Sequence, residues 1–186
     1  MIGVTKLLCG TVTPSDALRY GRRSDRSPSH LLQFTQDKKP IVVWNSTKAC
    51  NLRCIHCYYT ARAEADPDEL TTDEARTMID DLAGYGVPVF LFSGGEPLMR
   101  DDLYELGSYA VGRGLRTVIS TNGTLIDQEA AAHIKEAGFS YVGISLDGIG
   151  ETNDRFRGMS SAFEAALAGI RACTDVGAVS YTHLTL

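Results

Sequence analysis

The chain has 186 residues, a formal net charge of −5, and a composition that is 44% hydrophobic and 22% charged. This length suits one domain with a sizeable core, and the acidic balance argues against a nucleic-acid partner, because such partners select basic surfaces. Its apolar runs are too short to span a membrane, its N-terminus lacks the features of a secretion signal, and its five cysteines fit a reducing cytoplasm.

The first forty residues are predicted to form a polar, basic leader ahead of the folded core. Its arginines, Arg19, Arg22, Arg23 and Arg26, could meet acidic groups of a substrate or simply be solvated. These charges alone therefore do not choose a substrate.

Strands and helices are predicted to alternate from residue 41 to about residue 173. Apolar segments predict strands over 41–46, 88–93, 115–120 and 140–146. Helices are predicted between and after them. The first opens at a Thr71–Glu74 capping box and runs to about Leu82, the second runs from 101 to 112 or 114, and the others cover about 127–137 and 161–173. Buried strands separated by such helices indicate an α/β fold of parallel βα units, which cross over right-handed and close toward a barrel.

Three cysteines follow the first predicted strand with the spacing Cys-x3-Cys-x2-Cys: Cys50, Cys54 and Cys57. A [4Fe–4S] cluster takes four cysteine ligands, so three would leave one iron open. A structural zinc usually takes four protein ligands from paired Cys-x2-Cys units, but no second pair exists, and His56 lies between two of the cysteines. A ferredoxin would supply a fourth cysteine. The open cluster is favoured, with a zinc scaffold and an electron carrier as alternatives.

The remaining chemistry-bearing segments also follow predicted strands. Gly94-Gly95-Glu96-Pro97 comes after the second strand, whereas Ser120-Thr121-Asn122 and Ser145-Leu146-Asp147 lie at the C-terminal ends of the third and fourth. Parallel α/β folds bind ligands at this end of the sheet, so one shared site is predicted. Glycines let a backbone approach a ligand closely, and a carboxylate stabilises an ammonium group; alone, the glycine motif could be a tight turn with a solvated glutamate. Cys9 and Cys173 are expected to be small buried or indifferent residues.

The cysteine triplet followed by Gly-Gly-Glu-Pro resembles the radical S-adenosylmethionine (SAM) enzymes. The resemblance implies a parallel-stranded partial (β/α)6 barrel, truncated after about four βα units. It also implies a [4Fe–4S] cluster on Cys50, Cys54 and Cys57, with SAM at the open iron. The reduced cluster would cleave SAM to methionine and a 5′-deoxyadenosyl radical, which abstracts hydrogen from the substrate. A low-potential donor such as flavodoxin or ferredoxin would supply the electron, and no general base or nucleophile is required.

The same resemblance implies a set of SAM-binding residues. These are His56, Gly94, Gly95, Glu96, Pro97, Ser120, Asn122, Ser145, Asp147 and Arg157. The glycine motif would bind the methionine amino group, and His56 stands where the family usually has an aromatic residue beside adenine. Ser120, Thr121 and Asn122 match a position near the ribose and carboxylate. Arg155 and Arg157 could pair with the carboxylate. Any of these polar residues could instead cap a turn or carry a surface charge.

The leader resembles that of the tetrapyrrole-modifying branch, in particular the 12,18-didecarboxysiroheme deacetylases. Segments 1–12, 14–22 and 32–40 carry this likeness. It implies a tetrapyrrole substrate, from which two acetate side chains are removed to leave methyl groups and yield iron-coproporphyrin III. Related enzymes that form haem by decarboxylation, act in haem d1 synthesis or mature peptides remain alternatives, as does an inactive fragment.

The resemblance covers residues 1–178. Residues 179–186 depart from the expected pattern and are predicted to be a non-native, read-through tail on a truncated gene. A barrel cut after four strands would leave parallel edges unpaired, which favours aggregation. The chain is therefore expected to bind a cluster poorly and to turn over no substrate.

Overall fold

A computed structural model describes residues 39–178 and 180–184. The chain divides into two compact units, Met1–Pro40 and Ile41–Leu186. The predicted leader and Cys9 lie outside the described residues, apart from the last two positions of the leader. The leader's role, and the division of the chain into leader, core and tail, therefore remain predictions.

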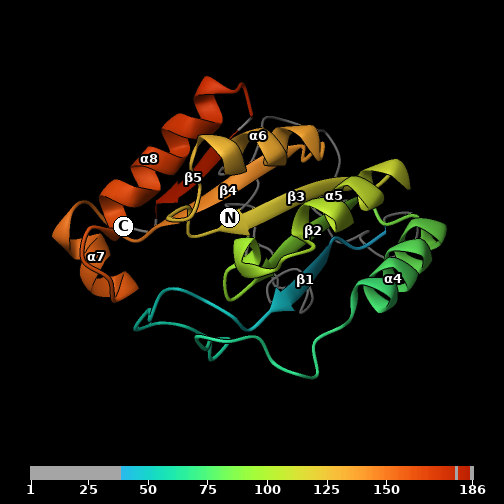
Figure 1. Cartoon of the computed structure of the whole chain (residues 1–186), viewed down its shortest axis with the longest axis horizontal. Helices are drawn as coiled ribbons and strands as arrows, with labels where there is room; N and C mark the ends of the chain where they lie inside the picture. The colour runs from blue at the N-terminus through green and yellow to red at the C-terminus, as the bar shows by residue number, and fades with distance from the viewer. Residues whose placement is uncertain (1–38, 179, 185–186) are drawn as a thin grey trace, which may run out of the picture. The chain divides into compact units, whose positions relative to one another are not determined.

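The second unit is built on a parallel sheet of five strands in the order β1-β2-β3-β4-β5 (Figure 1). The strands are β1 Val42–Thr47, β2 Val89–Gly94, β3 Arg116–Thr121, β4 Tyr141–Leu146 and β5 Ser180–Leu184. The first four begin one residue after their predicted starts. Strand order follows chain order, as in a barrel in which each βα unit adds the next strand. The predicted α/β class and parallel pairing are confirmed.

The fifth strand corrects the predicted number of strands. Residues 180–184 pair parallel with β4, from Val142 opposite Ser180 to Leu146 opposite Leu184, although four strands were expected to end the sheet. An open strand edge offers unpaired N–H and C=O groups to any extended segment, and threonine and tyrosine favour that conformation. Whether these residues are native to the protein remains a prediction.

Four helices form one layer over the sheet (Figure 1). They are α4 Thr72–Tyr85, α5 Leu103–Gly112, α6 Gln128–Glu136 and α8 Ala162–Asp175. At the start of α4, the Thr71 side chain accepts from the Glu74 N–H while the Glu74 carboxylate accepts from the Thr71 N–H, which confirms the predicted capping box. The helix ends at Gly86, whose φ of +82° suits glycine.

The core lies between this helix layer and one face of the sheet. Phe90, Phe92, Ile119 and Val142 are fully buried there, whereas alternate strand residues such as Ser120 are only partly buried. Successive side chains point to opposite faces of a strand, so the small polar residues fall on the face away from the helices. Cys173 of α8 belongs to the core, which confirms the expectation that it is a buried residue.

Two short elements complete the unit and were not predicted. A 3₁₀ turn, η1, covers Pro97–Met99, and a helix, α7, covers Glu151–Arg157. Gly150 and Gly158 flank α7 with φ values of +57° and +67°. A helix this short, enclosed by glycines, shows no helical hydrophobic period in the sequence. It nevertheless contributes to the site.

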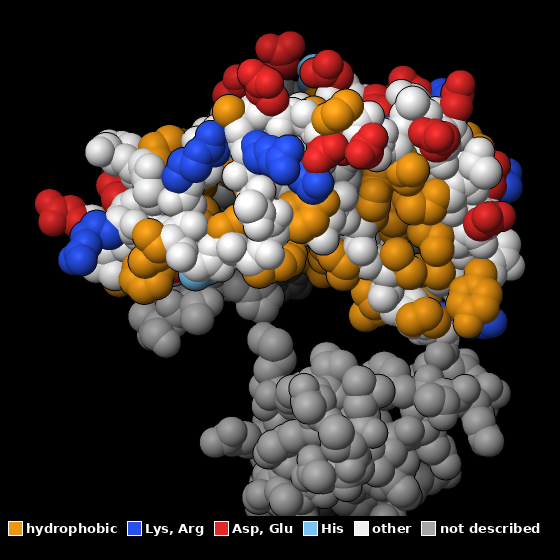
Figure 2. Space-filling view, turned by 90° about the horizontal axis from the view of Figure 1, so that it is seen from below, with side chains coloured by type: hydrophobic (Ala, Val, Ile, Leu, Met, Phe, Trp, Pro, Cys, Tyr) orange, Lys and Arg blue, Asp and Glu red, His pale blue; other side chains and the backbone are white. Residues whose placement is uncertain are grey.

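Seen from below, the molecule separates acidic and hydrophobic side chains (Figure 2). Acidic side chains gather along the upper edge of this view and hydrophobic ones lower down. The edge strand β1 and the residue before it expose Val43 and Ile41. Among the described residues, no helix is long and apolar enough to cross a membrane.

Candidate functional site

A cavity of about 640 Å³ lies at the C-terminal ends of β1 to β4. Its walls come from the loop after β1, the ends of the next three strands and the end of α7. The predicted site residues among its lining are Cys50, Cys54, His56, Cys57, Gly94, Gly95, Ser120, Asn122, Ser145, Asp147 and Arg157. Of the predicted set, Glu96 and Pro97 are not in the lining. The fold thus gathers residues from four separate strand ends into one site.

Backbone hydrogen bonds join the two ends of the cysteine loop, residues 48–62, whereas the middle of the loop is exposed to solvent. Cys50 N donates to Arg62 O at 2.7 Å, and Arg62 N donates to Lys48 O at 2.8 Å. Cys50 is buried, Cys54 is half-buried and Cys57 is exposed. The three thiols therefore run from the protein interior to the surface along one wall of the cavity.

These positions give two of the thiols different acidities. Burial raises the pKa of the Cys50 thiol above its ordinary value of 9.0. Backbone N–H groups of Ala61, Tyr59 and Thr60 lower the pKa of Cys57. Cys57 therefore becomes a thiolate, the form that binds metal, at lower pH than Cys50.

A single metal ion and a cubane cluster place different demands on the three thiols. Within the described part of the chain, no three His, Cys, Asp or Glu side chains converge as a single-ion site does. A zinc ion needs all its ligands at about 2.0–2.3 Å from one point, whereas each cysteine of a cubane binds a different iron. His56, the candidate fourth zinc ligand, lies with its Nε2 3.3 Å from Asp147 Oδ2.

Gly94 and Gly95 allow the backbone at the end of β2 to lie in direct contact with the backbone at the start of the cysteine loop. A Cβ at Gly95 would lie 2.2 Å from Ala49 O, and one at Gly94 would lie 2.5 Å from Thr47 O. Gly95 N donates to Thr47 O at 2.7 Å. The glycines were predicted to let the backbone approach a ligand; the structure shows that they are also needed to pack the β2 end against the start of the cysteine loop.

Glu96 is fully buried and its carboxylate faces the protein rather than the cavity. Its Oε1 accepts from Thr121 Oγ1 at 2.7 Å and from Leu98 N at 3.1 Å, and its Oε2 accepts from Asn122 N at 2.8 Å. Burial raises its pKa, although these donors oppose the rise. Glu96 thus connects the ends of β2 and β3, and the cavity meets this motif through Gly94 and Gly95. This geometry does not favour direct contact between Glu96, or the buried Pro97, and a ligand in the cavity.

An amide chain joins the β3 end to the cysteine loop. Asn122 Nδ2 donates to Asn51 Oδ1 at 2.9 Å, and Asn51 Nδ2 donates to Thr124 Oγ1 at 2.8 Å. Asn122 Oδ1 accepts from the Thr124 backbone at 2.8 Å. Asn51 and Thr124 were missed from the sequence; the only signal was that Asn51 directly follows a cysteine.

A charged group lines the β4 side of the cavity. Arg157 Nη2 lies 2.7 Å from Asp147 Oδ2, the carboxylate oxygen that also faces His56. The His56 ring contacts Phe156, with centroids 5.8 Å apart. The predicted residues His56, Asp147 and Arg157 thus form one connected group, which the sequence did not indicate.

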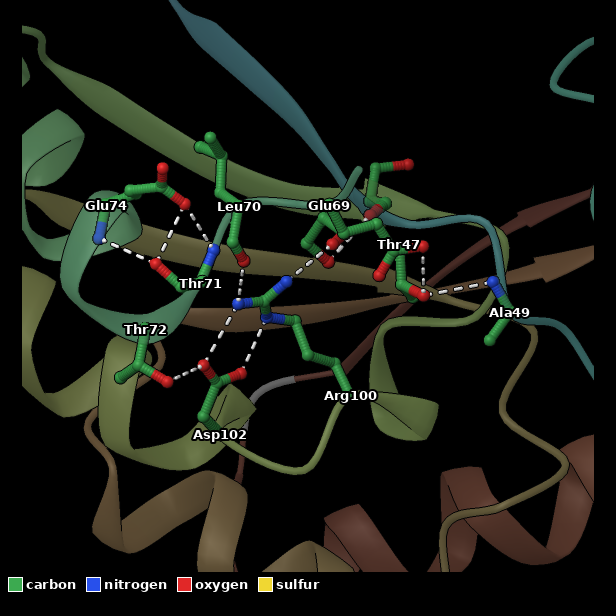
Figure 3. Close-up of polar contacts among 11 residues, drawn as sticks. Thr47, Ala49, Glu69, Leu70, Thr71, Thr72, Glu74, Arg100 and Asp102 are labelled. Carbon is green, nitrogen blue, oxygen red and sulfur yellow. Dashed lines mark hydrogen bonds and ion pairs between the residues drawn. The ribbon is translucent and has the colours of Figure 1, made fainter. Parts of the chain in front are cut away.

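Arg100 holds in place the segment of chain that precedes the cysteine loop (Figure 3). Its guanidinium donates to Ser46 O at 3.0 Å and Leu70 O at 2.7 Å, and pairs with Asp102 at 2.6 Å. Asp102 also accepts from Thr72 Oγ1 at 2.7 Å. One side chain thereby joins the end of β1, the segment before α4 and the segment after β2.

Glu69 holds the same segment through its own set of hydrogen bonds, beside those of Arg100 (Figure 3). Its Oε1 accepts from Thr47 Oγ1 at 3.1 Å, from Lys48 N at 2.7 Å and from Asp66 N at 2.9 Å. Thr47 Oγ1 in turn accepts from Ala49 N at 3.0 Å. The residues that lead into Cys50 are therefore fixed by backbone and side-chain hydrogen bonds.

Several named proteins are similar to this chain. The chain is 63% identical over 177 residues to the Fe-coproporphyrin III synthase of Methanosarcina barkeri, covering 95% of this chain and 44% of that protein. It is 51% identical over 140 residues to the pre-heme d1 synthase of Dinoroseobacter shibae, covering 75% and 34%. The chain thus spans less than half the length of these relatives.

Solved structures share the fold. The structure of anSMEcpe with bound AdoMet matches with a TM-score of 0.63 and 23% identity, over 75% of this chain and 42% of that one. Streptococcus suis SuiB bound to its precursor peptide SuiA matches with a TM-score of 0.67 and 17% identity, over 96% and 44%. The radical SAM superfamily profile matches residues 44–186. The chain therefore belongs to the radical SAM superfamily, whose cofactors are a [4Fe–4S] cluster and SAM.

Proposed function

We propose that this chain carries the cluster and SAM site of a radical SAM enzyme of haem biosynthesis that acts on a tetrapyrrole. One observation carries the proposal: three cysteines of one loop and the ends of the next three strands line a single cavity. When bound, the cluster and SAM supply a 5′-deoxyadenosyl radical by reductive cleavage of SAM. The chain's own residues bind, orient and enclose these groups.

The residues divide into cluster ligands and SAM-binding groups. Cys50, Cys54 and Cys57 would each bind one iron and leave the fourth iron open. The backbones of Gly94 and Gly95 and the polar side chains of Ser120, Asn122, Ser145 and Asp147 would contact SAM, since all line the cavity. Glu96 would act by holding the β2 and β3 ends in register.

The proposed reaction is removal of the acetate side chains of 12,18-didecarboxysiroheme to give iron-coproporphyrin III. The relative with 63% identity is named for that product, while those named for pre-heme d1 and for heme are 51% and 46% identical. The difference in identity favours the first reaction over the alternatives. We further propose a cytoplasmic location, because a reducing compartment keeps these thiols free. We also propose that a low-potential flavodoxin or ferredoxin supplies the electron that reduces the cluster.

Anaerobic reconstitution with iron and sulfide tests the site. The sequence led us to expect poor cluster binding, because the sheet edge after the fourth strand would be unpaired. Since β5 pairs with that edge, the chain is now expected to bind iron and sulfide in equal amounts and, with dithionite, to release 5′-deoxyadenosine from SAM. Replacing Cys50, Cys54 and Cys57 by alanine should abolish both. Cys173→Ala, which removes a thiol from the core, is the matched control and should retain the cluster. A chain that takes up only zinc, or a triple variant that retains the cluster, would overturn the proposal.

Substrate choice is tested by mass spectrometry. The reconstituted chain, SAM and reductant are incubated with 12,18-didecarboxysiroheme, and in parallel with iron-coproporphyrin III. Loss of both acetate side chains from the first compound, with formation of iron-coproporphyrin III, supports the proposed reaction. Consumption of the second compound alone would favour the haem-forming alternative.

A further inference from the structure

The end of α7 is docked on the cysteine loop. Arg53 N donates to Arg157 O at 3.2 Å, and Ile55 N donates to Phe156 O at 2.9 Å. A Cβ at Gly158 would lie only 2.3 Å from Arg53 O, so only glycine permits this approach. The loop segment that carries Cys54 is therefore held by a helix end about a hundred positions away in the chain.

The side chain of Arg157 reaches the cysteine itself. Its Nη1 lies 3.9 Å from Cys54 Sγ, and its Nη2 lies 2.7 Å from Asp147 Oδ2. The Arg157 side chain is 11% exposed, and its buried Nε has no hydrogen-bond acceptor among the described residues. A positive charge that cannot be lost by deprotonation is thus fixed next to a proposed cluster ligand.

Such a charge acts on the electron affinity of a cluster. Thiolates and cluster sulfides are negative, and one-electron reduction adds a further negative charge. A nearby cation therefore stabilises the reduced state more than the oxidised state, and burial strengthens the effect because screening is weak. Net charge, hydrogen bonds to sulfur and exposure are the factors that set the potentials of iron–sulfur clusters.

We propose that Arg157 is a positioning residue that holds the Cys54 segment and raises the reduction potential of the cluster, with Asp147 orienting its guanidinium. This inference rests on the proposed function. Asp147 has two opposing effects: it holds Arg157 in place, and its own negative charge partly cancels that of the guanidinium. Asparagine in place of Asp147 keeps an oxygen that can still hold the guanidinium, so Asp147→Asn removes mainly the negative charge and should raise the potential. Arg157→Gln removes the positive charge and should lower it.

Potentiometric titration followed by electron paramagnetic resonance tests the inference. It is performed on the reconstituted chain without SAM, so that substrate binding does not contribute. Arg157→Gln should make reduction at least tenfold less favourable, which corresponds to about 59 mV for one electron. Asp147→Asn should make it more favourable, and Arg157→Lys should remain closer to the parent than Arg157→Gln. Arg155→Gln is the matched control, because Arg155 is an exposed arginine in the same last turn of α7.

A second measurement addresses the loop without a cluster. In the apo chain, Arg157→Gln should speed hydrogen exchange at the amides of Arg53 and Ile55, whereas Arg155→Gln should not. Circular dichroism checks that each variant folds; if Arg157→Gln does not, Arg157→Lys and Asp147→Asn decide the matter.

The outcomes separate this inference from the proposed function. Equal potentials in Arg157→Gln and Arg155→Gln, with a cluster present in both, would overturn the role of Arg157 and leave the proposed function standing. If Arg157→Gln is unfolded, a lowered potential in Asp147→Asn would also overturn it. A parent chain without any cluster would overturn both proposals.

Discussion

The two sides of the cavity are built differently. On the side of β2 and β3, Glu96 and Asn122 are buried and joined by a hydrogen bond, and the half-buried Gly95 donates its N–H to Thr47 O. On the opposite side, Ile55 and Tyr58 of the cysteine loop are 72% and 79% exposed. The ends of β2 and β3 are therefore held in place by the protein itself. The order of the cysteine-loop tip depends on α7 and, in our proposal, on bound iron.

The largest effect is expected where two backbones cross on the rigid side. Gly95→Ala places a methyl group 2.2 Å from Ala49 O, far inside van der Waals contact. Neither the end of β2 nor the start of the cysteine loop can move away without losing backbone hydrogen bonds. We expect a loss of more than about 3 kcal/mol in the free energy of unfolding, in the range of severe buried substitutions. Urea denaturation measures it.

Gly84→Ala is the control for that substitution. Gly84 lies within α4, and nothing lies within 4 Å of a Cβ built there. Alanine should stabilise the helix by up to about 1 kcal/mol. If both variants were equally stable, the close crossing of the β2 end and the cysteine loop would be incorrect.

An intermediate effect is expected at the carboxylate that joins β2 to β3. Glu96→Gln turns an acceptor into an N–H donor facing Asn122 N or Thr121 Oγ1, which should cost about 1–3 kcal/mol of unfolding free energy. Glu105→Gln, on an exposed residue of α5, should cost much less. Comparable losses in both variants would contradict the role assigned to Glu96.

The same carboxylate predicts a pH dependence. Because burial raises the pKa of Glu96 above 4.5, the folded chain holds its proton more tightly than the unfolded chain. Its contribution to stability is therefore greatest below the unfolded pKa and falls as pH rises toward the folded pKa. Urea unfolding of the parent and of Glu96→Gln across this range should show a smaller decline in the variant.

The smallest effect is expected within the cysteine loop. In the apo chain, iodoacetamide should modify Cys57 about tenfold faster than Cys50 at neutral pH, because Cys57 is exposed with a lowered pKa and Cys50 is buried with a raised one. Mass spectrometry of peptides after timed quenching measures the rates. Buried Cys173 serves as the slow reference, and a Cys50 that reacts as fast as Cys57 would show that the two sides do not differ as described.

Most of the fold was predictable because its signals are local. The capping box at Thr71–Glu74 marks a helix start directly, and the short apolar runs of β2 to β4 between turn residues indicate buried strands. The helix α7 was not predicted, since a short segment between Gly150 and Gly158 carries no period. The strand β5 was assigned to a tail, because pairing at a sheet edge depends on a neighbouring backbone more than on the strand's own side chains.

The chain's sequence alone determined its superfamily, its cysteine triplet and the placement of polar segments after successive strands. Only the tertiary structure decided what those residues do to one another. It turned Glu96 inward to join two strand ends, and it brought Arg157 to Cys54 across 103 positions of chain. Spacing reports neighbours along the backbone, whereas the direction of a buried carboxylate or guanidinium follows from which donors and charges folding places around it.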